Sequence, residues 1–420
     1  MEKITIDFGY GNGVQTVSIP KKNLQCVLKA KDINHKNRDE AAVKYALQNP
    51  IGEKCLCDFD LSEKKNIVII TSDISRPLPS YTVIPSILDE LYKAGAKKEN
   101  ITVVFALGSH RHHTQEEMKH LVGERVFSEV RCEDSDPIDC IHMGTTKNGT
   151  PVDITRRVAE SDFRIGVGNI EFHYFAGFSG GAKALMPGVS TPTAIQYNHK
   201  LMVLPDSCAG KLEGNPLRAD IEESETYCHL DYIVNVVLDE HKKVVYGVAG
   251  DVTKAHRVGC EYLDNMYRCN IGKRADIVIV SQGGAPKDAN LYQTQKALDN
   301  SKHAIKKGGT IILIGACNEG FGSEKFKEWL INAPTPHSMI DRIKQKFELG
   351  GHKAAAIAMV LENAEIDLIS EMDDQTVKDI FLVPKTSAQQ AFDDAMKRYG
   401  ENATVIAMPF GGATLPVADD

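Results

Sequence analysis

The sequence predicts an α/β protein with two α/β domains, each built on a largely parallel sheet. Short runs of Ile, Val and other apolar residues alternate along the chain with segments whose apolar residues recur every three or four positions. This alternation is typical of strands joined by crossover helices, which form parallel sheets with helices on both faces. The length of 420 residues also favours two domains, because one domain usually has ~100–200 residues.

The first half of the chain contains the first alternating series. Its predicted strands lie at residues 4–10, 14–20, 66–71, 101–106 and 163–167, and its predicted helices at 80–94 and 114–121. The strand at 66–71 reads Asn-Ile-Val-Ile-Ile-Thr, as expected where both faces of a strand are covered. The helix at 80–94 has apolar residues at 84, 87, 88 and 91, which share one face, and it ends before Gly95.

The second half repeats this organisation after a region of different character. Residues 205–250 contain a predicted hairpin, and residues 251–270 form a predicted connecting helix. The later elements are strands at 275–280 and 310–314, a helix at 291–305, helices that begin near 323 and 339, and a last strand within 403–409. We therefore expect a domain boundary near residue 272, with an N-terminal α/β domain at 1–271 and a C-terminal α/β domain at 272–420.

Composition excludes several classes of function. The 49 Lys and Arg residues against 57 Asp and Glu leave a net charge of −8, without the basic footprint of a nucleic-acid-binding protein. No apolar run approaches the ~18 residues of a membrane span, and the N-terminal residues lack the apolar stretch of a signal peptide. We therefore expect a cytoplasmic protein without nucleic-acid or membrane partners. The ten cysteines contain no CxxC pair, which argues against structural zinc.

Polar residues follow three of the predicted strands directly. Asp73 and Arg76 come after the strand at 66–71, His110 after the next strand, and His173 after the strand at 163–167. Ligands of parallel α/β sheets bind at the carboxyl ends of the strands. Three such ends that carry Asp, Arg and His therefore indicate one site. We expect the neighbouring His112 and His113 to be solvated.

A glycine-rich segment follows His173 and contains Lys183 after Ser179, Gly180 and Gly181. Adjacent glycines allow a backbone to approach a ligand closely, although the spacing does not match a Walker A loop. A lysine in a partly dry site acts as a nucleophile or as the attachment point of a cofactor. A tight turn with a surface lysine is the other interpretation. His199 comes later in the chain, and a neutral imidazole ligates metals or transfers protons.

The predicted second domain adds a polar helix start. Asp288 or Asn290 is a suitable N-cap for the helix at 291–305, and Gln293 and Lys296 share one of its faces. A capped helix with a solvated lysine explains this pattern equally well when it is taken alone.

Taken together, these motifs resemble the nickel-pincer lactate racemase family. The matching segments are Ser72–Pro77, Gly108–Arg111, His173–Gly188 with Lys183, His199, and Tyr292–Lys296. They occur in the order of the family from about residue 66 to residue 300. The resemblance implies two α/β domains with the active site in the cleft between them. It makes residues 1–271 the cofactor-binding and catalytic domain.

The resemblance also implies a cofactor. It is a nickel complex of pyridinium-3,5-bisthiocarboxylic acid mononucleotide, which the family attaches to a lysine through a thioamide. The match places this attachment on Lys183, the protein ligand of nickel on His199, and the family's two acid/base histidines on His110 and His173. Cofactor-biosynthesis proteins are implied as partners.

The remaining site residues come from the same resemblance. Arg76 and Lys296 are expected to hold the carboxylate of a 2-hydroxy acid substrate. The other contacts with cofactor or substrate fall on Asp73, Ser179, Gly180, Gly181, Tyr292 and Gln293.

One position departs from the family pattern. Lactate racemases carry a tryptophan in a downstream helix, where this chain has Gly350 to Ala354 with His352 as a candidate substrate-binding residue. The single tryptophan, Trp329, is expected in the core. This departure extends the expected substrates from lactate to larger 2-hydroxy acids and to those with a second polar group.

The function implied by the resemblance is racemisation or epimerisation of 2-hydroxy acids by reversible hydride transfer, which makes the protein an isomerase. Two alternatives stay open from the residues themselves. One is a pyridoxal-phosphate enzyme with a Schiff base on Lys183, and the other is a non-catalytic nickel- or nucleotide-binding protein.

Overall fold

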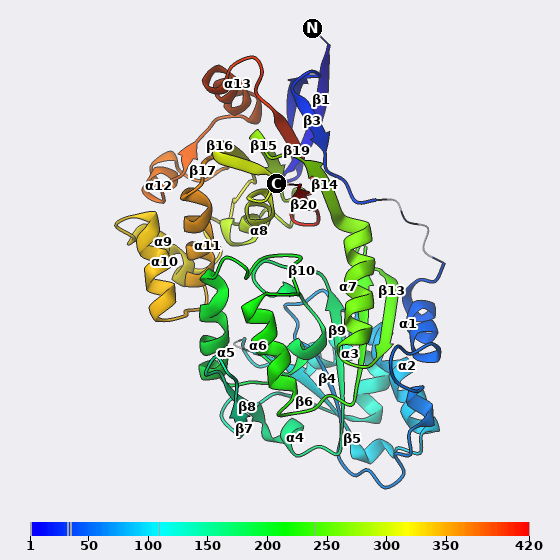
Figure 1. Cartoon of the computed structure of the whole chain (residues 1–420). Helices are drawn as coiled ribbons and strands as arrows, with labels where there is room; N and C mark the ends of the chain where they lie inside the picture. The colour runs from blue at the N-terminus through cyan, green and yellow to red at the C-terminus, as the bar shows by residue number, and fades with distance from the viewer. Residues whose placement is uncertain (1, 32, 34–35, 109, 240, 420) are drawn as a thin grey trace. The chain divides into compact units, whose positions relative to one another are not determined.

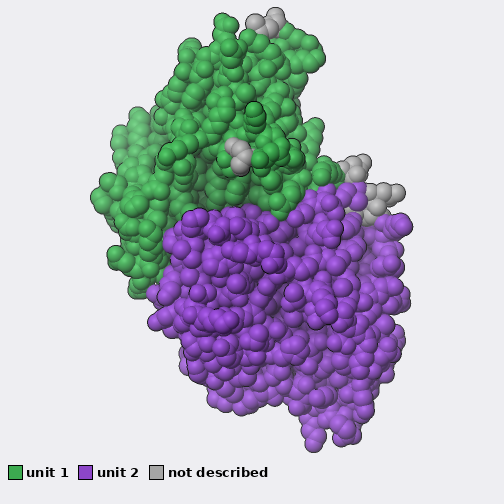
Figure 2. Space-filling view, viewed as in Figure 1, with its two compact units in different colours: residues 1–32, 266–420 green, residues 33–265 purple. Residues whose placement is uncertain are grey.

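The structure is a computed structural model that describes residues 2–31, 33, 36–108, 110–239 and 241–419. It divides into two compact units, coloured separately in Figure 2. Unit 1 comprises residues 1–32 and 266–420, and unit 2 comprises residues 33–265. Among the described residues, no helix has both the length and the apolar character that crossing a membrane requires.

Unit 2 is built on a six-stranded sheet of order β13-β12-β9-β4-β5-β6. Neighbouring strands run parallel, except for the antiparallel hairpin of β12 and β13. The strands are β4 (Ile67–Ser72), β5 (Ile101–Ala106), β6 (Arg131–Asp134), β9 (Phe163–Ile170), β12 (Tyr232–Leu238) and β13 (Val244–Gly250). The predicted strands after residue 60 and the predicted hairpin are therefore confirmed.

Burial of both sheet faces explains the apolar runs of unit 2. One face packs with α1 (Asp39–Gln48), α2 (Ser80–Lys93) and α3 (Gln115–Glu129) in a single hydrophobic core. The other face meets the 3₁₀ helix η3 (Gly181–Ala184), and Figure 1 shows α5 (Pro192–His199) and α6 (Pro216–Glu225) on that side. A strand covered on both sides has no face for polar side chains.

The remaining elements complete unit 2. They are α4 (Arg156–Ala159), α7 (Lys254–Tyr267), the 3₁₀ helices η1 (Leu56–Asp58), η2 (Lys98–Asn100) and η4 (Lys200–Val203), and the hairpins β7 (Cys140–Thr145) with β8 (Pro151–Thr155) and β10 (Phe172–His173) with β11 (Gly177–Phe178). The α7 helix corresponds to the connecting helix predicted at 251–270.

The helix predicted at 114–121 is longer in the structure. Thr114 begins it with a capping box, in which its side chain accepts from the Glu117 amide and the Glu117 carboxylate accepts from the Thr114 amide. The helix then continues to Glu129 through a kink at Gly123, where φ is 82°. Because a glycine usually ends a helix, the sequence pattern placed the end too early.

Unit 1 contains a second six-stranded sheet, of order β18-β17-β16-β15-β19-β3, in which all neighbouring strands are parallel. Its strands are β3 (Leu24–Val27), β15 (Ala275–Ser281), β16 (Ile305–Ile314), β17 (Ala364–Ile369), β18 (Val383–Pro384) and β19 (Val405–Met408). Two-stranded pairs are the hairpin of β1 (Lys3–Tyr10) and β2 (Gly13–Pro20), and β14 (Arg268–Gly272) with β20 (Leu415–Ala418). An α/β fold with two largely parallel sheets is thus confirmed.

The helices of unit 1 begin with the three that the sequence pattern predicts, at 291–305 and from near 323 and 339. They are α8 (Leu291–Ser301), α9 (Glu324–Ile331), α10 (Pro336–Gln345), α11 (Gly351–Leu361), α12 (Asp374–Asp379) and α13 (Ala388–Tyr399). The helix predicted at 291–305 ends four residues earlier, because Ile305 already begins β16.

The division of the chain differs from the predicted domains 1–271 and 272–420. Residues 1–32 belong to unit 1, because β3 pairs with β19 at the edge of its sheet. The β1–β2 hairpin also buries Phe8 and Ile19 in the same core as Ile277 and Phe392. The paired residues of β3 and β19 are about 380 positions apart. A local sequence pattern cannot predict such a pairing.

Candidate active site

The loop that carries Lys183 starts at the carboxyl end of β9. It turns through the β10–β11 hairpin and enters η3. Gly180 and Gly181 both have positive φ, 79° and 61°. A Cβ atom on Gly180 would lie 2.7 Å from Asn235 Oδ1, and one on Gly181 would lie 2.9 Å from an Arg218 nitrogen. Glycine is therefore required here by backbone conformation and by packing against the side chains behind the loop.

Polar contacts hold this loop against the sheet. The Ser179 hydroxyl donates to the Asn169 carbonyl at 2.7 Å and accepts from the Glu171 amide at 2.9 Å. The Gly181 amide donates to Asn235 Oδ1 at 2.8 Å. The hydrogen bonds of the Ser179 hydroxyl therefore stabilise the loop. We expect a ligand to contact the backbone of Ser179.

Lys183 lies within η3 and is partly buried. Its pKa lies well below the ordinary value of 10.5. Desolvation is the largest cause, and the positive charges of Arg76 and Arg218 add to it, whereas Glu171 acts in the opposite direction. A lysine in this setting favours the uncharged amine, which is the nucleophilic form.

Asp73 and His110 form a close pair at two adjacent strand ends. His110 Nδ1 lies 2.6 Å from Asp73 Oδ2, and the Ser75 hydroxyl donates to Asp73 Oδ1 at 2.9 Å. Burial raises the pKa of Asp73, but the hydrogen bond with His110 and the charges of His110 and Arg76 outweigh it, so that the pKa is lowered overall. An ionised Asp73 places the proton of a neutral His110 on Nδ1 and leaves the lone pair on Nε2.

Arg76 belongs to the same loop, and its side chain is exposed. Its amide donates to the Asp73 carbonyl at 3.1 Å, so the loop turns tightly between the two residues. The charge of its guanidinium lowers the pKa of both Asp73 and Lys183. The side chain is nevertheless accessible in unit 2.

His173 and His199 both contact the ring of Phe175. The ring centroid of Phe175 is 4.5 Å from that of His173 and 4.9 Å from that of His199. The amide of Ala176 donates to His173 Nδ1 at 3.3 Å. The hairpin thereby brings the two predicted histidines together although they are far apart in the sequence.

Asn198 sets the tautomer of His199. The Asn198 amide nitrogen donates to Asp220 Oδ2 at 2.8 Å, which turns its oxygen toward His199 Nδ1 at 3.0 Å. His199 therefore donates from Nδ1, and the lone pair of the neutral ring is on Nε2. A second hydrogen-bonding residue of this kind is typical of a metal-ligating histidine.

His113 is not the solvated residue that the sequence suggested. Its side chain is 1% exposed, and its Nδ1 lies 2.6 Å from Asp134 Oδ1. Its Nε2 accepts from the Ile74 amide at 3.0 Å, so it joins the two loops that carry Asp73 and His110. The prediction holds for His112, whose side chain is 68% exposed.

Four residues that the sequence analysis missed lie behind the Lys183 loop. They are Arg218 and Glu222 on α6 and His256 and Arg257 on α7. Arg218 is 1% exposed and His256 is fully buried. An Arg and a Glu four residues apart look like an ordinary exposed helix pair in a sequence, so no local signal marks them.

The predicted site residues of unit 1 gather around the start of α8. Asn290 caps this helix by accepting from the Gln293 amide at 3.1 Å. The rings of Tyr292 and His352 lie 6.4 Å apart and nearly at right angles. Gln293 is partly exposed and Lys296 is exposed. The predicted Asn290 cap is thus confirmed, and Tyr292 and His352 are brought together.

A further lysine, Lys353, lies at the same place. Its ammonium donates to the Tyr292 carbonyl at 2.5 Å and stands 4.1 Å from the centre of the Tyr292 ring. The side chain is 5% exposed. Lys353 therefore joins the first turn of α11 to the first turn of α8.

Trp329 is buried, as expected, at 1% exposure. Its Nε1 donates to Glu348 Oε2 at 2.7 Å, and Arg342 packs over the ring at 4.0 Å. A Cβ atom on Gly351 would lie 2.2 Å from the indole, so glycine is required where α11 begins. This packing holds the helix start that presents His352.

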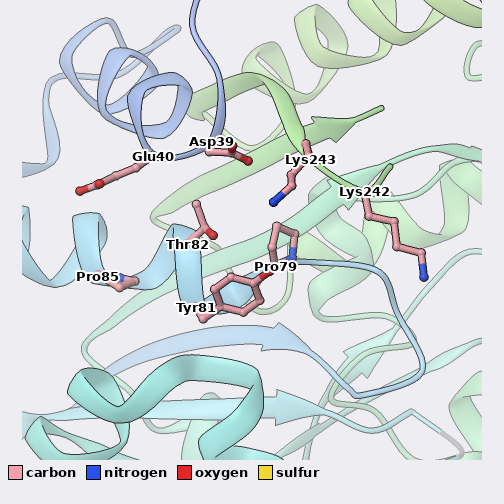
Figure 3. A pocket seen from close by; sticks show the side chains of 8 residues that line it. All are labelled: Asp39, Glu40, Pro79, Tyr81, Thr82, Pro85, Lys242 and Lys243. Carbon is pink, nitrogen blue, oxygen red and sulfur yellow. The ribbon is translucent and has the colours of Figure 1, made fainter. Parts of the chain in front are cut away.

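A separate pocket of about 430 Å³ lies elsewhere in unit 2 (Figure 3). Asp39 and Glu40 from α1, Tyr81 from α2, and Lys242 and Lys243 before β13 contribute to its lining. It contains none of the predicted site residues. The candidate site is therefore defined by the strand-end residues and not by this pocket.

The comparison with known protein families supplies the deciding observation. Residues 10–210 match the model of the lactate racemase N-terminal domain, and residues 271–415 match that of the lactate racemase C-terminal domain. The chain belongs to the lactate racemase family. It is accordingly an isomerase of the racemase type.

Two lactate racemases resemble the chain over nearly its whole length. The lactate racemase of Thermoanaerobacterium thermosaccharolyticum is 34% identical over 97% of both chains. That of Lactiplantibacillus plantarum is 31% identical over 97% of this chain and 98% of its own.

Solved structures agree with this family assignment. The lactate racemase apoprotein from T. thermosaccharolyticum superposes with a TM-score of 0.90 at 33% identity and covers 98% of this chain and all of its own. A protein from Thermotoga maritima, with a TM-score of 0.65 at 19% identity over 90% of this chain and 98% of its own, shares the fold.

Candidate residues occur in both lactate racemase family domains. The N-terminal one contains the unit 2 candidates from Asp73 to His199, and the C-terminal one contains those from Tyr292 to His352. Arg218 and His256 lie in the segment between the two matched regions.

Proposed function

We propose that this member of the lactate racemase family racemises or epimerises 2-hydroxy acids, with His110 and His173 as its two acid/base residues. The observation that carries the proposal is the pair of His110 and the ionised Asp73 at the strand ends that also adjoin the Lys183 loop. This pair leaves Nε2 of His110 as a proton acceptor. A reaction that starts with the deprotonation of a hydroxyl requires such an acceptor.

The residues of unit 2 fit the cofactor of the family, the nickel complex of pyridinium-3,5-bisthiocarboxylic acid mononucleotide. An uncharged Lys183 amine suits the proposed thioamide attachment. The pincer group of this cofactor supplies most of the nickel ligands, so that one histidine of the protein completes the coordination. His199, with its lone pair on Nε2, suits that role. Among the described residues, no three His, Cys, Asp or Glu side chains gather into a metal site, so nickel would depend on ligands from the cofactor.

The chemistry that this group supplies when bound is reversible acceptance of a hydride from the α-carbon of the substrate. The chain has to supply the proton transfers. His110 takes the hydroxyl proton on Nε2, while Asp73 stabilises the charged ring through Nδ1. Asp73 is thus assigned as a positioning residue for His110.

His173 is poised in the complementary state. Its Nδ1 accepts the Ala176 amide, which orients the ring with Nε2 on the other side. His173 acts as the acid in its doubly protonated form, and it is neutral again after it gives up one proton. One enantiomer would be deprotonated by His110 and the other by His173, since the two hydroxyls point to opposite sides of the α-carbon. In each direction one ring is neutral and takes the hydroxyl proton, while the other is protonated and returns a proton.

Arg76 and Lys296 are proposed to bind the carboxylate of the substrate. Both side chains are exposed in their own units. The planar guanidinium of Arg76 matches a carboxylate through two parallel hydrogen bonds. Ser179, Gly180 and Gly181 would contribute backbone atoms beside the cofactor.

The substrate is proposed to be lactate, or a 2-hydroxy acid that is larger or carries a second polar group. His352 supports the wider range, because its ring lies 6.4 Å from that of Tyr292, over which the Lys353 ammonium is placed. Tyr292 and Gln293 would complete the contacts from unit 1.

The test begins with the mass of the Lys183 peptide, from protein produced together with the cofactor-biosynthesis proteins. A sulfur-containing mononucleotide adduct and bound nickel are expected, with interconversion of D- and L-lactate or of a related hydroxy acid by chiral chromatography. A pyridoxyl mass on Lys183 would favour the pyridoxal-phosphate alternative. An unmodified lysine with bound nickel and no turnover would favour a binding protein.

A further inference from the structure

The buried group behind the Lys183 loop is arranged around one guanidinium. Arg218 Nε donates to Glu222 Oε1 at 2.6 Å. Arg257 donates to both oxygens of the same carboxylate, at 2.8 and 2.9 Å. Two arginines therefore share this glutamate, and Arg257 also lies 3.8 Å from the exposed carboxylate of Glu213. Within the buried part of the group, one carboxylate faces two guanidinium charges.

His256 fixes Arg218 without adding charge. Its Nε2 donates to the Ser179 carbonyl at 2.8 Å. Its Nδ1 accepts from Arg218 at 3.2 Å and from Arg257 at 3.3 Å. Burial is the largest cause that lowers its pKa well below the ordinary value, and the charge of Arg218 is the next. A neutral His256 with this tautomer satisfies all of these contacts.

The guanidinium of Arg218 lies directly behind the glycines that precede Lys183. It faces the carbonyls of Phe178 and Gly180 at 3.4 Å. A Cβ atom on Gly181 would lie 2.9 Å from its nitrogen and 3.0 Å from the His256 ring. The absence of a side chain at Gly181 therefore lets the loop pass close to this buried charge.

We propose that Arg218 is a positioning residue that, together with the burial of Lys183 and the charge of Arg76, keeps the Lys183 amine uncharged, with His256 and Glu222 holding the Arg218 guanidinium behind Gly181. The inference rests on the proposed attachment of the cofactor to Lys183, because an amine forms that bond only in its uncharged form.

The surroundings of Lys183 agree with this role. The η3 helix packs against β9, α6 and β4. These elements bring Glu171 from the end of β9, Arg218 from α6 and Arg76 from the loop after β4, so positive charge prevails. The same three residues are those that shift the pKa of Lys183, in addition to its desolvation.

The experiment measures the reactivity of Lys183 in apo-protein made without the cofactor-biosynthesis proteins. Trace acetylation with acetic anhydride is followed by mass spectrometry of the Lys183 peptide over a range of pH. In the wild type we expect half-maximal labelling at a pH well below that of the exposed lysines. Arg218→Met should raise this midpoint by about 1 pH unit, since a like charge at close range has that effect.

Matched variants separate this effect from a general loss of structure. Arg218→Lys keeps the charge and should retain the wild-type midpoint. Arg257→Met removes the second cation on the same glutamate and should leave the midpoint unchanged, because Arg257 does not contribute to the environment of Lys183. If Arg218→Met does not fold, the double variant Arg218→Met/Glu222→Gln removes both buried charges. Its labelling midpoint is then measured instead.

An unchanged midpoint in a folded Arg218→Met or double variant would overturn the inference, and so would an equal rise in Arg257→Met. The outcome is independent of the proposed function, which the mass of the loaded Lys183 peptide tests. An unmodified Lys183 in loaded preparations refutes the attachment even where Arg218 controls the amine.

Discussion

His110 Nδ1 lies 2.6 Å from Oδ2 of the buried Asp73, and this contact joins the carboxyl ends of β4 and β5. It pairs a candidate acid/base histidine with a carboxylate whose pKa is lowered. The contact determines which ring nitrogen of His110 can take a proton.

Asp73→Asn is expected to lower kcat by at least ~100-fold, because an amide cannot stabilise the protonated ring of His110. The measurement is the initial rate with each enantiomer in cofactor-loaded enzyme. Ser75→Ala removes a hydroxyl that donates to the same carboxylate and lies 3.1 Å from His110 Nδ1. It leaves the charge of Asp73 in place, so it is the control and should lose much less. Equal losses in the two variants would show that Asp73 does not act through His110.

The same carboxylate predicts a pH dependence of stability. The pKa of Asp73 is lowered in the folded protein from its ordinary value of 3.8. A lowered carboxyl pKa stabilises the fold above the unfolded value, and this stabilisation is lost as pH falls through the folded value. Urea unfolding should therefore show a constant difference between wild type and Asp73→Asn above about pH 5, which shrinks below pH 3.8. A difference that grows in acid would contradict this prediction.

Lys183→Met should raise the melting temperature of the apo-protein at pH 7 while it abolishes racemisation and nickel retention. A lysine with a lowered pKa gives up its proton on folding, so it opposes folding until pH exceeds the unfolded value of 10.5. The gain in melting temperature should shrink as pH rises toward that value. Thermal scans at several pH values test this, and Lys98→Met, at an exposed position of η2, is the surface control.

His113→Ala should destabilise the protein by about 1–3 kcal/mol, because it leaves Asp134 and the Ile74 amide without their buried partner. His112→Ala should change the free energy of unfolding by no more than about 0.5 kcal/mol, since its side chain is largely exposed. Urea denaturation of both variants gives the comparison. Similar values for the two would remove the structural role assigned to His113.

Gly181→Ala should cost more stability than Gly149→Ala. Both glycines have positive φ, 61° and 80°, so each substitution carries a backbone penalty of roughly 1–2 kcal/mol. A Cβ atom on Gly149 meets nothing within 4 Å, whereas one on Gly181 meets Arg218 and His256. The difference between the two free energies of unfolding isolates the packing term, and a difference of zero would mean that Arg218 and His256 move aside without cost.

Most of the parallel strands and their helices could be predicted because their signals are local. The apolar residues of β4, for example, follow one another directly, and Ile84, Ile87, Leu88 and Leu91 share one face of α2 and are all buried there. The candidate residues at strand ends were found by the same logic, since parallel strands end at one edge.

Other features depended on contacts between distant residues. The pairing of β3 with β19 assigns the N-terminal strands to unit 1. The burial of His113 depends on Asp134 and Ile74, and that of Arg218 on the Lys183 loop. A short sequence motif does not show whether a charged side chain is buried.

The sequence by itself determined the alternation of strands and helices, the family resemblance and the candidate residues, because side-chain periodicity and motif spacing are local properties of a chain. Only the tertiary structure decided which histidine nitrogen carries its proton and which charges face Lys183. Those properties depend on hydrogen-bond partners and burial, which arise when β9, α6 and α7 pack together.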